Sequence, residues 1–144
     1  MSHRSFAYGL AVLSSLSAAP AISAEPGLQA AVKGARNAKG RIGCLLFDSA
    51  DGFPADQKKA RQRVLGTITK GAAVCTFDAP AGSYAIVAMH DENANGKLDK
   101  NLLGMPTEGY GASRSAQGAF GPKYEDARFE YRGGSLTVPI TLKY

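Results

Sequence analysis

The sequence has no apolar run long enough to cross a bilayer as a helix, which takes about 20 residues. An apolar stretch over residues 6–16 follows a single fixed positive charge at Arg4, and small residues continue up to Ala24. This order is typical of a cleavable export signal. We therefore predict a signal peptide over residues 1–24, one mature domain over residues 25–144 without a membrane span, and a location in the periplasm or outside the cell.

Aromatic residues are missing from the two basic clusters of the chain, residues 33–41 and 58–63. Nucleic-acid platforms combine basic side chains with aromatic ones, so we expect no nucleic-acid partner. The formal net charge of the whole chain is only +5. We expect the two clusters to be solvated loops or sheet edges. The alternative is an unspecific attraction to anionic lipid or cell-wall polymers.

Cysteine is scarce as well, with only Cys44 and Cys75 in the chain. Neither lies near the end of the predicted signal, so a lipoprotein anchor is not supported. In an oxidising compartment such a pair favours a disulfide, which would close a loop of about 30 residues and stabilise the fold by on the order of 3 kcal/mol. Each cysteine lies mid-strand, and the two strands could be neighbours, which favours the bridge. The alternative is two buried reduced thiols.

Apolar residues alternate with polar or small ones along most of the mature chain, which is the pattern of β-strands. Residues 42–47 are apolar on both faces and predict a strand buried on both sides. Residues 74–77 and 84–89, separated by a short turn, predict a hairpin whose second strand is central. Pro139, within the last strand, indicates a sheet edge or a bulge. About seven strands and no long helix predict an all-β fold, a single β-sandwich of transthyretin-like or immunoglobulin-like arrangement.

One glycine-rich segment, residues 90–123, has no apolar periodicity. Loops of that length in a compact domain are usually functional or disordered. We predict a long loop over one end of the sandwich, with His90, Tyr110, Phe120 and Tyr124 as a binding surface. Aromatic side chains on an ordered loop suit contact with an envelope polysaccharide, a peptide or a protein. The alternative is that these aromatics cover the edge of the sandwich.

Within that segment, oxygen-bearing side chains occupy the first, third, fifth and ninth positions of a nine-residue stretch, with glycine at the sixth. Calcium takes about six to eight oxygen ligands, and this spacing lets a curled loop bring them together. The predicted ligands are Asp91, Asn93, Asn95, the Lys97 carbonyl, Asp99 and, from outside the stretch, Glu108, with Asp48 or water as the alternatives that would complete the set. Leu102 at the twelfth position excludes an EF-hand. The open alternative is a polar turn in which the asparagines and Gly96 supply left-handed backbone conformations.

Several motifs of the mature chain resemble those of a known family. They are HDENANGKLD at residues 90–99, GMPTEGYG at residues 104–111, the strand start at residues 82–86, Ser113, Gly121 and Pro122. Together they resemble domain of unknown function 2141, a group of exported and uncharacterised bacterial proteins. The resemblance extends over nearly all of the mature chain and implies export and a small β-rich domain. Arg114 and Lys123 depart from the pattern, which has asparagine and proline there.

These features predict an exported, non-catalytic binding or structural domain whose long loop is organised by a calcium-type cation. The alternative is a periplasmic hydrolase, metal-assisted or transthyretin-like, that uses His90. His90, Asp91 and Ser113 are the residue types of a hydrolytic triad, but no nucleophile-elbow pattern surrounds Ser113. Convergence of His90, Ser113 and Arg132 in one cleft would favour the enzyme.

Overall fold

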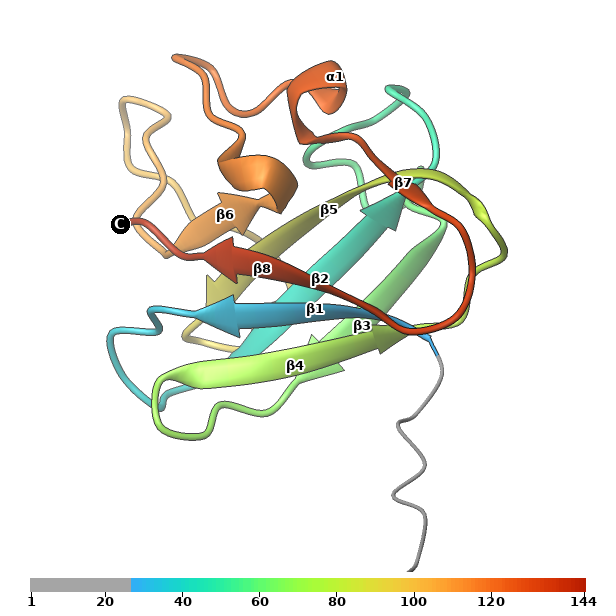
Figure 1. Cartoon of the computed structure of the whole chain (residues 1–144). Helices are drawn as coiled ribbons and strands as arrows, with labels where there is room; N and C mark the ends of the chain where they lie inside the picture. Colours follow the sequence, from blue (N-terminus) through green and yellow to red (C-terminus); the bar gives the residue numbers. More distant parts are fainter. Residues whose placement is uncertain (1–26) are drawn as a thin grey trace, which may run out of the picture.

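The computed structural model describes residues 27–144, which form two β-sheets packed face to face (Figure 1). The signal peptide predicted over residues 1–24 lies outside the described residues. The elements are β1 (Leu28–Lys33), β2 (Arg41–Phe47), β3 (Gln62–Gly66), β4 (Ala72–Phe77), β5 (Gly82–Asp91), β6 (Tyr110–Ala112), η1 (Ser113–Ser115), α1 (Tyr124–Ala127), β7 (Phe129–Tyr131) and β8 (Leu136–Thr141). The predicted β-sandwich is confirmed, with eight strands in place of about seven. In the described part of the chain no helix is long and apolar enough to span a membrane.

The two sheets differ in size and in pairing. The three-stranded sheet has the order β4-β1-β8, and its β1–β8 pair is parallel. The five-stranded sheet has the order β3-β2-β5-β6, with β7 paired to the first residues of β5. The central place predicted for β5 is confirmed, because β5 pairs with β2, β6 and β7. Pro139 lies in β8, which pairs only with β1 inside its sheet, so the predicted edge position is also confirmed.

The five-stranded sheet carries apolar side chains on both faces. On β2, Ile42 and Leu46 belong to the core between the sheets, whereas Leu45 and Phe47 belong to a second cluster on the outer face. The strand is therefore buried on both sides, as its sequence predicts. The outer cluster is covered by α1 and by loops, so the outer face of this sheet is the place where loops can shape a site.

A disulfide joins Cys44 of β2 to Cys75 of β4, with the two Cα atoms 6.4 Å apart. Both cysteines are fully buried in the core. The predicted bridge is thus present, but it does not link neighbouring strands. It links the two sheets across the sandwich, because β2 and β4 belong to different sheets.

Two expectations about chain path are wrong. Residues 74–77 and 84–89 do not form a hairpin, because β4 and β5 belong to different sheets and the turn between them carries the chain across the sandwich. Phe77 and Tyr84 consequently face the same core from opposite sides. The segment 90–123 is not one continuous loop either, because β6 and η1 divide it into loop 92–109 and loop 116–123.

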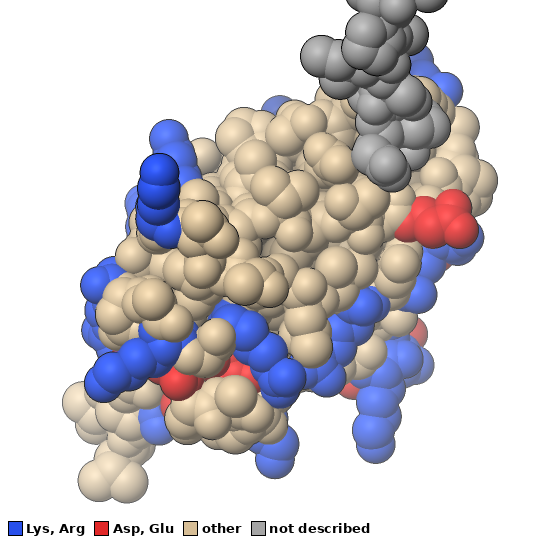
Figure 2. Space-filling view, turned by 90° about the horizontal axis from the view of Figure 1, so that it is seen from below, with Lys and Arg blue, Asp and Glu red and all other residues tan. Residues whose placement is uncertain are grey.

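The basic side chains are dispersed. On the face seen from below, Lys and Arg side chains are spread around a wide uncharged area, and some lie beside acidic side chains (Figure 2). Ion pairs join Arg36 to Glu92, Lys59 to Asp51 and Arg61 to Asp48. The basic excess is therefore not gathered into one patch on this face.

Candidate functional site

Loops 92–109 and 116–123 rise over the outer face of the five-stranded sheet (Figure 1). Together with the β2–β3 loop they enclose a cavity of about 560 Å³. Residues of β2 and β5 that point away from the core form its floor, namely Gly43, Leu45, Val87 and Met89. The strand alternation of the sequence thus leaves an apolar floor that the two loops frame.

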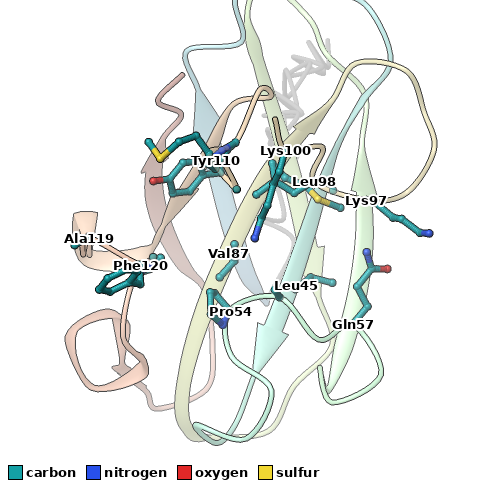
Figure 3. A pocket seen from close by; sticks show the side chains of 18 of the residues that line it. Leu45, Pro54, Gln57, Val87, Lys97, Leu98, Lys100, Tyr110, Ala119 and Phe120 are labelled. Carbon is teal, nitrogen blue, oxygen red and sulfur yellow. The ribbon is translucent and has the colours of Figure 1, made fainter. Parts of the chain in front are cut away.

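The walls of this cavity are also apolar (Figure 3). Leu98, Leu103 and Met105 line it from loop 92–109, and Phe120 and Pro122 line it from loop 116–123. The side chains of Leu103 and Phe120 are 87% and 104% exposed, so they are not packed against the rest of the domain. Large apolar side chains exposed around one hollow make it a candidate binding site.

Among the described residues, Lys97 and Lys100 are the only charged ones that line the cavity. Figure 3 shows the Lys100 side chain reaching over the floor toward Val87, whereas Lys97 points away from it. Neither lysine forms an ion pair with an acidic side chain within residues 27–144. The cavity therefore combines an apolar lining with an excess of positive charge.

The start of loop 92–109 is fixed by Asp91, whose side chain is 1% exposed. Its Oδ1 accepts a hydrogen bond from the Asn95 backbone N–H (2.9 Å), and its Oδ2 accepts one from the Gly96 N–H (2.8 Å). Arg41 Nε lies 3.5 Å from the same Oδ2 and balances the buried charge. Gly96 has φ +81°, a left-handed conformation that costs glycine little. These contacts curl residues 91–96 into a tight turn.

The side chains of Asn93, Asn95 and Asp99 converge within this turn. Asn93 Nδ2 lies 2.6 Å from Asp99 Oδ2, and Asn95 Nδ2 lies 2.8 Å from Asp99 Oδ1. The amide oxygens accept backbone bonds, Asn93 Oδ1 from the Asn95 N–H (3.1 Å) and Asn95 Oδ1 from the Lys97 N–H (2.9 Å). Asp91, Asn93, Asn95 and Asp99 thus form one hydrogen-bonded cluster.

Glu108, the predicted ligand from outside the stretch, braces the other side of the loop. It is 5% exposed, and its Oε1 and Oε2 accept the backbone N–H groups of Glu92 (2.9 Å) and Asp99 (3.1 Å). Both carboxylate oxygens of Glu108 therefore already accept hydrogen bonds from the backbone of the loop. In the described range 27–144, no three or more His, Cys, Asp or Glu side chains are grouped as metal ligands. A cation in this turn would have to be held largely by asparagine and carbonyl oxygens.

Glu92 ties the loop to the β1–β2 connection. Asn37 Nδ2 donates to Glu92 Oε2 at 2.9 Å, and the Arg36 guanidinium lies 2.6 Å from Oε1. The Asn37 hydrogen bond, and less strongly Arg36, lower the pKa of the Glu92 carboxyl below its ordinary 4.5, although partial burial opposes them. The Glu92 carboxylate thus links loop 92–109 to the β1–β2 loop by a hydrogen bond and an ion pair.

The segments that build this site are those of a described family. Residues 30–139 match the family model described as "Uncharacterized protein conserved in bacteria (DUF2141)". The chain belongs to the DUF2141 family. The match runs from β1 into β8 and includes both loops around the cavity. No curated protein and no solved structure matches this chain.

Two glycines of the motif at residues 104–111 have a steric role in this DUF2141 domain. A Cβ on Gly109 would lie 2.4 Å from the Tyr144 ring, and a Cβ on Gly111 would lie 2.5 Å from the Thr141 carbonyl oxygen. Both distances are too short for a side chain. The glycines therefore let β6 approach the C-terminal strand, which anchors the end of loop 92–109.

His90 of the DUF2141 domain is fully buried between three segments. Its Nε2 lies 2.8 Å from the Lys39 carbonyl oxygen, and its Nδ1 lies 2.7 Å from the Tyr144 hydroxyl. Because a carbonyl oxygen only accepts, Nε2 carries a proton, and a neutral ring then accepts the Tyr144 O–H at Nδ1. The Tyr144 oxygen also accepts the Arg36 backbone N–H (3.0 Å). Both ring nitrogens are occupied, so His90 fastens the β1–β2 loop and the C-terminus to β5.

Ser113 is also buried and lies apart from His90. Its Oγ donates to the Ala127 carbonyl (2.6 Å) and accepts the Ile86 N–H (3.0 Å). Ile86 and His90 are four residues apart on β5, which is about 13 Å along a strand. Arg132 follows β7, which pairs with the opposite end of β5. Ser113 and Arg132 therefore lie away from the His90 end of β5, so the geometry does not favour the hydrolase alternative.

The predicted binding surface is only partly at the surface of the DUF2141 domain. Tyr110 and Phe120 line the cavity, but burial removes His90 and Tyr124 from that surface, and the Tyr124 ring packs against Phe53. A single sequence does not reveal which aromatics of an aperiodic segment pack inward.

Sequence reasoning also missed several residues of the cavity. They are the floor residues of β2 and β5, together with Lys100, Leu103 and Met105 of loop 92–109. The available signal was the presence of large apolar residues in a glycine-rich segment that has no periodicity.

Proposed function

We propose that this DUF2141 protein is an exported, non-catalytic binding domain that holds an apolar ligand in the cavity between loops 92–109 and 116–123. The cavity itself carries the proposal. Its volume of about 560 Å³ lies in the range of small-molecule sites, roughly 300–1,000 Å³, and its lining is apolar with a few polar groups, as in such sites. The Cys44–Cys75 disulfide supports export, because disulfides persist mainly in oxidising compartments.

The neutral fluorescent probe 1-N-phenylnaphthylamine tests this proposal. It should bind the mature protein saturably at one site, because its rings match the apolar floor and walls. Leu103→Ser and Phe120→Ser should each raise its Kd by about tenfold, since each removes apolar contact area. Leu65→Ser is the matched control, because Leu65 is an exposed leucine on β3 outside the cavity. Equal effects of Leu65→Ser and Leu103→Ser, or no saturable binding, would contradict the proposal.

A calcium-type cation organises loop 92–109 in this proposal. Its support is the convergence of Asp91, Asn93, Asn95 and Asp99 in one turn. Carboxylate, amide and carbonyl oxygens are the hard ligands that calcium takes, and the Lys97 carbonyl and water would complete the shell. Ligation would replace the hydrogen bonds from the Asn93 and Asn95 amides to Asp99 by bonds from the same side chains to the ion. The ion would thereby offset the entropy cost of ordering the wall of the cavity.

Millimolar calcium should raise the melting temperature of the mature protein by about 3 to 8 °C, the shift expected for a site of submillimolar affinity. Asp99→Asn should abolish the shift, because it removes a charged ligand while keeping the size of the side chain. Asp126→Asn, an exposed change on α1, should keep it. Identical melting curves in calcium and in chelator would reduce the turn to a hydrogen-bonded loop without an ion.

A further inference from the structure

We propose that the ligand of the cavity is a single-chain anionic amphiphile, a fatty-carboxylate type of molecule whose alkyl tail lies on the apolar floor and whose head group pairs with Lys100. This inference rests on the proposed binding function and specifies its ligand class.

The apolar part of the ligand follows from the lining. Floor and walls are built from Leu, Val, Met, Pro and Phe side chains of five separate segments, β2, the β2–β3 loop, β5 and loops 92–109 and 116–123. Among the few polar groups there, the Gln57 amide already donates to the Gly96 carbonyl oxygen. A sugar would bring many hydroxyls to a surface with few hydrogen-bond partners, and each unpaired hydroxyl costs binding energy. An alkyl chain needs no such partners and would cover the exposed faces of Leu103 and Phe120.

The sign of the head group follows from the charges. The lining contains two lysines and no aspartate or glutamate, and neither lysine has an acidic partner in the described chain. Lys100 reaches over the floor, so its ammonium lies beside the apolar surface where the first carbons of a tail would rest (Figure 3). A carboxylate there would gain a charge-assisted hydrogen bond, whereas a cationic head would meet uncompensated positive charge.

Competition against bound 1-N-phenylnaphthylamine measures the preference of the cavity for an anionic over a cationic head group. Dodecanoate and dodecyltrimethylammonium carry tails of the same length and heads of opposite charge, and both are used below their critical micelle concentrations. We expect dodecanoate to displace the probe with a Kd at least about tenfold lower than that of the cationic amphiphile. The difference should shrink in high salt, because the head group remains close to solvent.

Charge-reversal variants locate the head group. Lys100→Glu should raise the Kd of dodecanoate by about five- to tenfold and lower that of dodecyltrimethylammonium. Lys33→Glu changes the net charge equally but lies at the end of β1, outside the cavity, and should change neither. Phe120→Ser should weaken both amphiphiles alike, because it affects only the tail. Circular dichroism melts confirm that each variant is folded.

The remaining outcomes separate this inference from the binding function beneath it. Saturable probe binding with equal displacement by both amphiphiles would overturn the anionic head group and leave the binding domain standing. Absence of binding by both the probe and dodecanoate would overturn both proposals. Sedimentation with phosphatidylglycerol vesicles without saturable dodecanoate binding would overturn the cavity ligand and indicate a membrane surface as the partner.

Discussion

Replacing both cysteines, Cys44→Ala with Cys75→Ala, is expected to lower the free energy of unfolding by about 3 to 5 kcal/mol. The bridge closes a loop with a sequence separation of 31 and joins the two sheets through the buried core. Without it the unfolded chain gains the conformational freedom of that loop, and the core loses the packing of two buried sulfur atoms. For a domain of this size the melting temperature should fall by roughly 10 to 20 °C.

Urea unfolding followed by circular dichroism measures this loss. Reducing agent should lower the urea midpoint of the native protein toward that of the double variant and should leave the double variant unchanged. That second result is the control, because it separates the disulfide from other effects of the reagent. A double variant that melts within about 2 °C of the native protein would show that the sheets hold together without the bridge.

Glu108→Ala is expected to open loop 92–109. The buried carboxylate accepts the backbone N–H groups of Glu92 and Asp99, and each N–H left without a partner costs about 1 to 3 kcal/mol. The loop can recover part of this cost by exposing both groups to water, so the expected result is local unfolding rather than collapse of the sandwich. The cavity would lose a wall, and binding of 1-N-phenylnaphthylamine should weaken by more than about tenfold.

Hydrogen exchange of individual amides gives the direct measurement. The Glu92 and Asp99 amides should exchange about a hundredfold faster in Glu108→Ala, while amides of β2 keep their native rates. Glu125→Ala is the control, because Glu125 is an exposed acid whose ion pair with Arg128 contributes little. Unchanged exchange rates of the Glu92 and Asp99 amides would show that Glu108 does not stabilise the loop.

The strands of this domain were predictable because burial on a sheet leaves a period of two in the sequence. The apolar run at residues 42–47 predicted a strand buried on both faces, and Pro139 indicated a strand at the edge of its sheet. The path between strands was not predictable in the same way. The turn after Phe77 reverses the chain equally well for a hairpin or for a crossing to the other sheet, and only the packing of the whole core decides between them.

The candidate site was predictable only in its local parts. The spacing of Asp91, Asn93, Asn95 and Asp99 suggested that these side chains lie in one turn, and the hydrogen bonds that join them there span only a few residues of sequence. The cavity joins residues from β2, β5, the β2–β3 loop and loops 92–109 and 116–123, which are distant along the chain. The three-residue strand β6 was missed because it is too short to show alternation, and without it the loops cannot be placed.

The pairing of β1 bears on when the domain can fold. This first strand lies between β4 and β8, and its parallel ladder with β8 joins the two ends of the described chain. Contacts of such high contact order form late and make folding slow. Under the proposed export, a chain that crosses the membrane as an extended thread would therefore keep the three-stranded sheet incomplete until residues 136–141 have emerged on the far side.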